Sequence, residues 1–259
     1  MVNLDSKLTL ESLLPFGMIA TKQWLLSMGL KLHSIDNALK SKKLVLLSAG
    51  VYARTGVPVT WQGVDSSLQK MSEQVVHVGG LSALELLGFG HYFSNKNTQH
   101  IRLYSRTKLP MWIEKLKLPV TFDWLGTKTL WSKEFLELRD YAIEHDWRED
   151  LPPVKLSCPE KAYLEMLMDV PDKISFDHAN ELMQGMTSQS PKKLAILLRA
   201  CRNVKVKRLF FWLAERQGYS WSHKLDYRKL DLGKGKRVIA SKGKLDNKFL
   251  ITVPEHLHG

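Results

Sequence analysis

The stretch FGMIATKQWLLSMGLKLHSIDNALKSKKLVLLSAGVYAR, residues 16–54, predicts two short helices and a hairpin near the start of the chain. Thr21 is a suitable N-cap for a helix over residues 22–28, because its hydroxyl can accept from a free backbone amide of the first turn. Gly29 can end that helix in the left-handed conformation. Its apolar face is expected to hold Trp24, Leu25 and Met28. A second helix is expected over residues 32–41, and this order is typical of a winged helix-turn-helix.

The second helix has the two faces that a helix in the major groove needs. Its apolar residues recur at helical spacing and are expected to be buried: Leu32, Ile35, Ala38 and Leu39. Short polar and basic side chains lie opposite, where they can reach base edges and phosphates. Asn37 can make a bidentate contact with adenine, and Lys40 can reach guanine or a phosphate.

The wing is expected from two strands, residues 43–47 and 50–54, around a turn at Ser48-Ala49-Gly50. Basic residues beside it would lie near the backbone phosphates. The residues expected to contact DNA are Lys31, His33, Ser34, Asn37, Lys40, Ser41, Lys42, Lys43 and Arg54. A short helix over residues 8–14 is expected to precede the motif. The structural alternative is a helical pair with a hairpin that binds no nucleic acid.

Length and charge limit the class of protein. A chain of 259 residues can form one large or two ordinary domains, and no apolar run approaches the roughly 20 residues of a membrane span. The net charge of +12 favours a polyanionic partner, most often nucleic acid, with a merely soluble basic protein as the alternative. Cys158 and Cys201 alone build neither a disulfide scaffold nor a zinc site, and the N-terminus lacks a secretory pattern, so a cytoplasmic protein is expected.

The rest of the chain mixes helices and strands, and the expected fold class is α+β, with a larger α/β domain after the winged one. Strands are expected at 75–78, 99–104, 118–125, 154–157, 237–240 and 249–253. Helices are expected at 61–71, 81–87, 109–117, 159–168, 176–186, 191–201 and 204–217. Residues 128–153 allow no assignment. The predicted divisions are a winged domain over 1–56, a bridging helix over 57–72 and a C-terminal domain over 73–259.

Two further features are candidates for binding sites. Gly79-Gly80 lies between a strand and a helix, which indicates either close packing or an anion bound at the helix N-terminus. The segment from Arg199 to Lys248 holds 15 Lys+Arg against 4 Asp+Glu. Its basic residues either follow a phosphate chain or form a solvated face. The candidates, expected on a polar face, are Lys205, Lys207, Arg208, Lys234, Lys236 and Arg237.

The chain carries no pattern of a known catalytic centre. It has no nucleophile elbow, no HExxH and no His/Cys cluster with zinc spacing. A nuclease-like pairing of Asp172 with Asp246 and Lys248 is also present. We expect Asp246 in a turn and Asp172 between helices, which argues against this pairing. We therefore expect no catalytic residue, metal or cofactor.

Several strings together carry a family resemblance: WQGVDSSLQ, VHVGGLSALELLGFGHY, SCPEKAYLEML, CRNVKVKRLFFWLAERQGYSW and LDLGKGKRVI. In this order, over about residues 10–254, the chain resembles the AbiEi family of antitoxins from bacterial abortive-infection, or type IV toxin–antitoxin, systems. The resemblance implies phage defence, with a winged domain that represses its own promoter at inverted repeats. It implies a C-terminal domain that counters a neighbouring nucleotidyltransferase-like toxin, without requiring direct contact. The wing tip departs from the family pattern because it lacks arginine.

Two other functions remain open at this stage. One is an RNA-binding or nucleotide-handling protein that uses the basic C-terminal region, and the other is a nuclease. The oligomeric state is also open, and a monomer that binds DNA cooperatively fits the sequence.

Overall fold

The computed structural model describes residues 9–89, 99–138 and 140–258. The N-terminal elements are α1 (Leu10–Leu13), β1 (Ile19–Thr21), α2 (Lys22–Ser27), α3 (Leu32–Lys40), β2 (Leu44–Ser48) and β3 (Val51–Arg54). The strands form an antiparallel three-stranded sheet in the order β1-β3-β2. This is the predicted winged helix-turn-helix arrangement, with β1 as a third strand that the sequence analysis missed. Leu8, in the predicted first helix, lies outside the described residues.

The apolar faces of α2 and α3 are narrower than predicted. In α2 only Leu25 is buried, while Met28 is 39% exposed. In α3 Ile35 and Ala38 are buried, but Leu32 is 46% exposed. The predictions for Met28 and Leu32 were wrong, because helices this short place only their middle turns over the small core of the domain.

Helix α4 (Trp61–Met71) joins the winged domain to the rest of the chain. Thr60 caps it, since its hydroxyl accepts from the Gly63 amide at 3.4 Å. One side of the helix faces the winged domain, where Val64 packs with Ile19, Val51 and Ala53. Trp61 and Leu68 belong to the C-terminal core. The bridging role is therefore performed by a helix that is buried from Gly63 to Leu68.

The centre of the molecule is a mixed five-stranded sheet in the order β6-β5-β4-β8-β7. Its strands are β4 (His77–Val78), β5 (Gln99–Ser105), β6 (Val120–Gly126), β7 (Ala142–His145) and β8 (Val154–Ser157). Strands β5 and β6 are parallel, as are β4 and β8, whereas β4–β5 and β7–β8 are antiparallel. The helices that follow β4, β6 and β8 are α5 (Gly80–Leu86), α6 (Lys133–Glu137) and α7 (Pro159–Met166).

The Gly79-Gly80 turn explains how β4 meets α5. A Cβ atom on Gly79 would press on the Tyr104 ring and the Glu165 carboxylate, so close packing is confirmed. The Gly80 amide also donates to Glu165 Oε2 at 3.2 Å. The anion at this helix N-terminus is thus a carboxylate of the chain itself.

The C-terminal third is helical and ends in a hairpin. Its elements are α8 (Phe176–Gly185), α9 (Pro191–Ala200), α10 (Val204–Gln217), β9 (Lys244–Asp246) and β10 (Ile251–Val253). The partner of β10 is β9, so the predicted strand at 237–240 was wrong; Arg237 forms only an isolated bridge with Ile251. The predicted helix at 109–117 is a single 3-10 turn, Ile113–Lys115. No described helix is long and apolar enough to cross a membrane.

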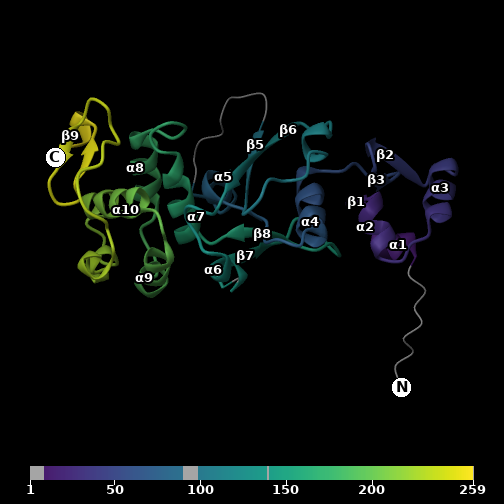
Figure 1. Ribbon diagram of the computed structural model, residues 1–259, viewed down its shortest axis with the longest axis horizontal. Helices are drawn as coiled ribbons and strands as arrows, with labels where there is room; N and C mark the ends of the chain where they lie inside the picture. Colours follow the sequence, from purple (N-terminus) through teal and green to yellow (C-terminus); the bar gives the residue numbers. More distant parts are fainter. Residues whose placement is uncertain (1–8, 90–98, 139, 259) are drawn as a thin grey trace, which may run out of the picture.

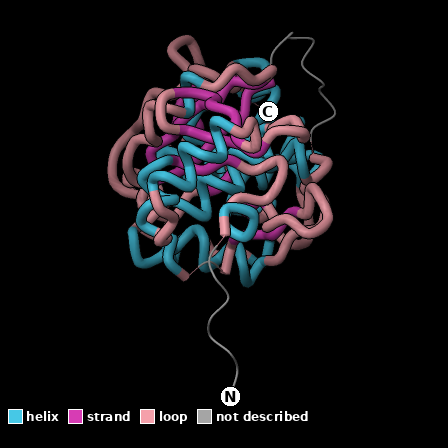
Figure 2. Tube along the Cα trace, turned by 90° about the vertical axis from the view of Figure 1, so that its right-hand side faces the viewer, coloured by secondary structure: helices cyan, strands magenta, loops and turns pink. Residues whose placement is uncertain are grey.

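The helices and strands are arranged along one long axis (Figure 1). The winged domain lies at one end, the sheet in the middle, and the hairpin β9–β10 at the other end. Figure 2 looks along this axis and shows helices and loops around the strands.

Candidate nucleic-acid interface

Helix α3 presents a continuous polar face to solvent. His33, Asp36, Asn37 and Lys40 are all exposed and lie at spacings of three and four residues, which places them on one side of the helix. Buried Ile35 and Ala38 hold the opposite side against the domain. Asp36 therefore belongs to the middle of this face. A carboxylate there can accept from cytosine N4, but it repels phosphates.

Two of the predicted lysines, Lys42 and Lys43, form the turn after α3 with their backbones. Lys42 has a φ of 56°, in the left-handed region. Its amide donates to the Leu39 carbonyl at 3.0 Å, and the Lys43 amide donates to the Ala38 carbonyl at 2.9 Å. These two bonds form a Schellman motif, in which the left-handed position usually belongs to glycine. The chain accepts a left-handed lysine here, at a cost of about 1–2 kcal/mol.

Two of the predicted serines are partly engaged within the domain. Ser34 is half-buried, and the Ser41 hydroxyl donates to the Ala38 carbonyl at 3.3 Å. By contrast, the lysines at both ends of α3 are exposed: Lys31, Lys40, Lys42 and Lys43. The cationic part of the predicted set therefore surrounds the polar face of α3.

The wing is short and carries no cation at its tip. Ala49 and Gly50 connect β2 to β3, and the Gly50 carbonyl accepts from the Lys22 amide at 2.7 Å. This bond ties the wing to the first residue of α2 and leaves the exposed Lys22 side chain beside the tip. The sequence analysis missed Lys22, because only the folded hairpin brings it close to the wing.

The sequence analysis expected Arg54 near the DNA backbone phosphates. In the structure its side chain packs against the winged domain. It lies at the base of β3, and its guanidinium carbon is 3.7 Å from the centre of the Phe16 ring. A cation–π contact of this kind uses the face of the guanidinium group. Arg54 is also half-buried, so its main contact is with the domain itself.

The predicted basic surface in the C-terminal region is largely internal. Arg208 is 2% exposed, and its guanidinium donates to four backbone carbonyls at 2.7 to 3.1 Å. Those carbonyls belong to Leu232, Gly233, Gly235 and Leu250. Burial lowers the pKa of Arg208, and the nearby Arg237 adds to this effect. Arg208 thus fastens the glycine-rich loop 232–235 and the hairpin to α10.

Two more of these residues are also not surface residues. Lys207 is 5% exposed. The half-buried Lys205 donates through Nζ to the carbonyls of Met168 and Val170, at 2.8 and 2.7 Å. The expectation of a polar face was wrong for Lys205, Lys207 and Arg208, because α10 is covered on nearly all sides. Of the six, only Lys234, Lys236 and Arg237 are exposed. They belong to the segment between α10 and β9, which lies at the end of the molecule opposite α3 (Figure 1).

The nuclease-like residues do not form a metal centre. Asp246 is the last residue of β9, so its expected place in a turn was wrong. It accepts from the Phe249 amide at 2.7 Å, and Lys248 pairs with Glu215. Within residues 9–89, 99–138 and 140–258, no three His, Cys, Asp or Glu side chains are grouped so that they could hold a metal ion.

The fold and the exposed face of α3 define a two-domain protein, with a winged helix-turn-helix in front of a larger α+β domain. The comparison with family models agrees. Residues 5–95 match the model described as "Transcriptional regulator, AbiEi antitoxin N-terminal domain". Residues 98–254 match the model described as "Transcriptional regulator, AbiEi antitoxin, Type IV TA system". The chain belongs to the AbiEi family of type IV antitoxin transcriptional regulators.

Other comparisons are less specific. The crystal structure of the RV2827C protein from Mycobacterium tuberculosis is similar at a TM-score of 0.48 and 17% identity, over 90% of this chain and 85% of that chain. No curated protein matches the chain significantly.

We predict that Arg208→Ala lowers the free energy of unfolding by more than about 3 kcal/mol, because it leaves four backbone carbonyls without their donor and opens a cavity where the buried side chain lay. Urea denaturation measures this change. Lys234→Ala removes a nearby charge from an exposed position and should change stability by less than about 0.5 kcal/mol. Equal, small effects of both substitutions would show that Arg208 does not hold the loop.

Proposed function

We propose that this protein is a DNA-binding repressor of its own promoter. The observation that carries the proposal is the exposed face of α3, with His33, Asn37 and Lys40 beside one another. Exposed lysines at both ends of the helix would neutralise phosphates, while the amide and imidazole groups would read bases. Membership in a family of transcriptional regulators supports this role.

The operator we propose is double-stranded DNA with inverted repeats. A helix-turn-helix reads a short stretch of one groove, so two copies of the chain on a two-fold repeat would double the contacts. The short wing, with Lys22 beside its tip, would touch the backbone rather than bases. We also propose that the winged domain ends near residue 56 and that the bridging helix ends near residue 72. The N-terminal family model extends further, to residue 95.

The second half of the proposal concerns the toxin. In an antitoxin of this family, we infer that the C-terminal domain counters a neighbouring nucleotidyltransferase-like toxin, with or without direct contact. The exposed candidates for this role are Lys234, Lys236 and Arg237. We propose no catalytic activity. The alternative, an RNA-binding or nucleotide-handling role of the basic region, is weakened because half of the predicted basic residues serve the fold.

For DNA binding, we predict that Asn37→Ala weakens operator binding by about 1–3 kcal/mol, the usual loss for a bidentate base contact. Affinity for random DNA should change much less. Fluorescence anisotropy with both DNAs at one salt concentration measures the difference. Asn247→Ala is the matched control, because Asn247 is an exposed asparagine in the hairpin at the far end. An equal loss on operator and random DNA would mean that Asn37 reads no base.

For the toxin, we predict that Lys234→Glu/Lys236→Glu/Arg237→Glu leaves the protein folded and still repressing, but abolishes rescue of cells that express the toxin. Each exposed substitution should cost less than about 0.5 kcal/mol of stability. The complementary variant, Lys31→Ala/Lys40→Ala/Lys42→Ala/Lys43→Ala, should lose repression and keep rescue. Co-expression with the toxin, together with a promoter reporter, measures both activities.

Full rescue by the first variant would remove these three residues from the antitoxin role. Loss of rescue in the second variant would show that the two activities are not separable.

A further inference from the structure

Asp36 is an exposed carboxylate in the middle of the polar face of α3. It lies three residues after His33 and four before Lys40, so both flank it on the same side of the helix. The other carboxylate of residues 9–56 is Glu11, which belongs to α1. Asp36 is therefore the acidic group that α3 would bring to DNA.

No contact within the described part of the chain accounts for this carboxylate. Asp36 forms neither a hydrogen bond nor an ion pair with any described residue, although Lys40 lies one turn further on. At the same spacing in α6, Lys133 and Glu137 lie 3.5 Å apart. Asp36 also follows the first turn of α3, which is where a carboxylate would stabilise the positive end of the helix. Its role is therefore not explained by the stability of the fold.

Bringing Asp36 to a duplex is unfavourable unless a base compensates for its charge. A carboxylate repels the phosphates that the surrounding lysines attract. It also repels the acceptor atoms that guanine, adenine and thymine present in the major groove. Cytosine alone offers an amino donor there without an acceptor on its own edge. The chemistry of Asp36 thus favours one base out of four.

The lengths of the side chains on α3 allow such a contact. An aspartate reaches a base edge only if its helix comes close to the floor of the groove. The exposed residues beside it, His33 and Asn37, are also short, whereas the long side chains of Lys31 and Lys40 lie at the ends of the helix. The centre of this face can therefore approach base edges while the ends contact phosphates.

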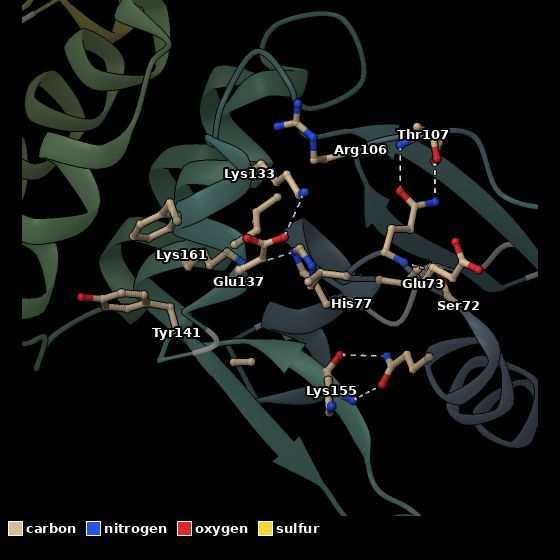
Figure 3. Close-up of a pocket in the computed structure, with 17 residues that line it drawn as sticks. Ser72, Glu73, His77, Arg106, Thr107, Lys133, Glu137, Tyr141, Lys155 and Lys161 are labelled. Carbon is tan, nitrogen blue, oxygen red and sulfur yellow. Dashed lines mark hydrogen bonds and ion pairs between the residues drawn. The ribbon is translucent and has the colours of Figure 1, made fainter.

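The cationic cavity of the C-terminal domain is a separate feature. It has a volume of about 480 Å³, and four of its six charged lining side chains are cations. Figure 3 shows two of them, Arg106 and Lys155, at opposite edges of the cavity. Lys133 lies 3.5 Å from Glu137, and Lys161 lies 3.4 Å from a buried glutamate. Because its cations are paired or far apart, this cavity offers no surface that competes with α3 for reading DNA.

We propose that Asp36 is a specificity-determining residue, which accepts a hydrogen bond from N4 of a cytosine in each half of the operator. Its charge also weakens binding to sites that lack this cytosine. The inference rests on the DNA binding proposed above and adds a C·G base pair to each half-site. Because Asn37 is assigned to adenine, the two neighbouring residues select different bases.

Selection of duplexes from a random-sequence pool, with the full chain as the binding protein, tests this inference. The wild type should enrich an inverted repeat with a C·G base pair in each half. Asp36→Ala should enrich the same repeat without the preference at that base pair. Asp36→Asn should prefer adenine there, because asparagine pairs with the N6 and N7 atoms of adenine.

Fluorescence anisotropy with the selected duplex gives the magnitudes. For the wild type, replacing the cytosine in both halves should weaken binding by about tenfold or more. For Asp36→Ala, the same replacements should change the affinity by less than about threefold. Random DNA should bind Asp36→Ala more tightly than the wild type, because a negative charge has been removed.

Asp172→Ala is the matched control, because it removes an exposed aspartate of the C-terminal domain and should leave every base preference unchanged. Asn37→Ala should relax a different base pair. Melting curves verify that each variant is folded.

The possible failures are distinguishable. If the wild type enriches no sequence, the proposed DNA binding fails, and the role of Asp36 fails with it. An enriched operator with the same base preferences for the wild type and Asp36→Ala would overturn the role of Asp36 alone. Loss of preference at a base pair other than C·G would overturn the assignment of cytosine.

Discussion

The close approach of α4 to the winged domain is the constraint on which the arrangement of the molecule depends. Gly63 lies directly against the carbonyl of Gly17, where a Cβ atom would have no room. Four residues on, the Ser67 hydroxyl accepts from the Ile19 amide at 3.0 Å. Ile19 belongs to β1, so the edge of the wing sheet is bonded to the helix that also enters the C-terminal core. The winged domain, with α3, is therefore carried on a fixed support rather than on a flexible linker.

Because the winged domain is held in place, the basic C-terminal loop stays far from α3. The exposed basic residues of the C-terminal loop lie at the far end of the molecule from α3 (Figure 1), so one chain would not place both on the same short stretch of duplex. Along the sequence, residues 1–54 carry 7 Lys+Arg against 3 Asp+Glu, a net of +4, and residues 151–259 carry 20 against 11, a net of +9. Between them, the end of α4 contributes Gln69 to a wall of the cationic cavity. One helix therefore packs against both the winged domain and the core of the C-terminal domain.

Local signals in the sequence were sufficient for most of the helices, but not for strands such as β1 and β7 and not for burial. Thr21, Thr60 and Pro159 mark helix starts correctly, because caps and first-turn prolines depend on neighbouring residues alone. Arg208 was expected on a surface, because its four carbonyl acceptors lie 24 to 42 residues further along the chain. The exposed polar face of α3 was largely predictable from its periodicity. The cavity was not, since its lining residues become neighbours only when the sheet is assembled.

Unfolding of a Gly63→Ala variant in urea tests most directly whether α4 fixes the winged domain. Alanine in an unobstructed helix normally raises stability by about 0.8–1 kcal/mol over glycine. Here we predict a loss of about 1–3 kcal/mol, because the methyl group meets the Gly17 backbone. Gly185→Ala in α8 is the control, since its Cβ would make only ordinary contact, 3.9 Å from the Phe89 carbonyl oxygen. A gain in stability for Gly63→Ala like that of the control would contradict the account.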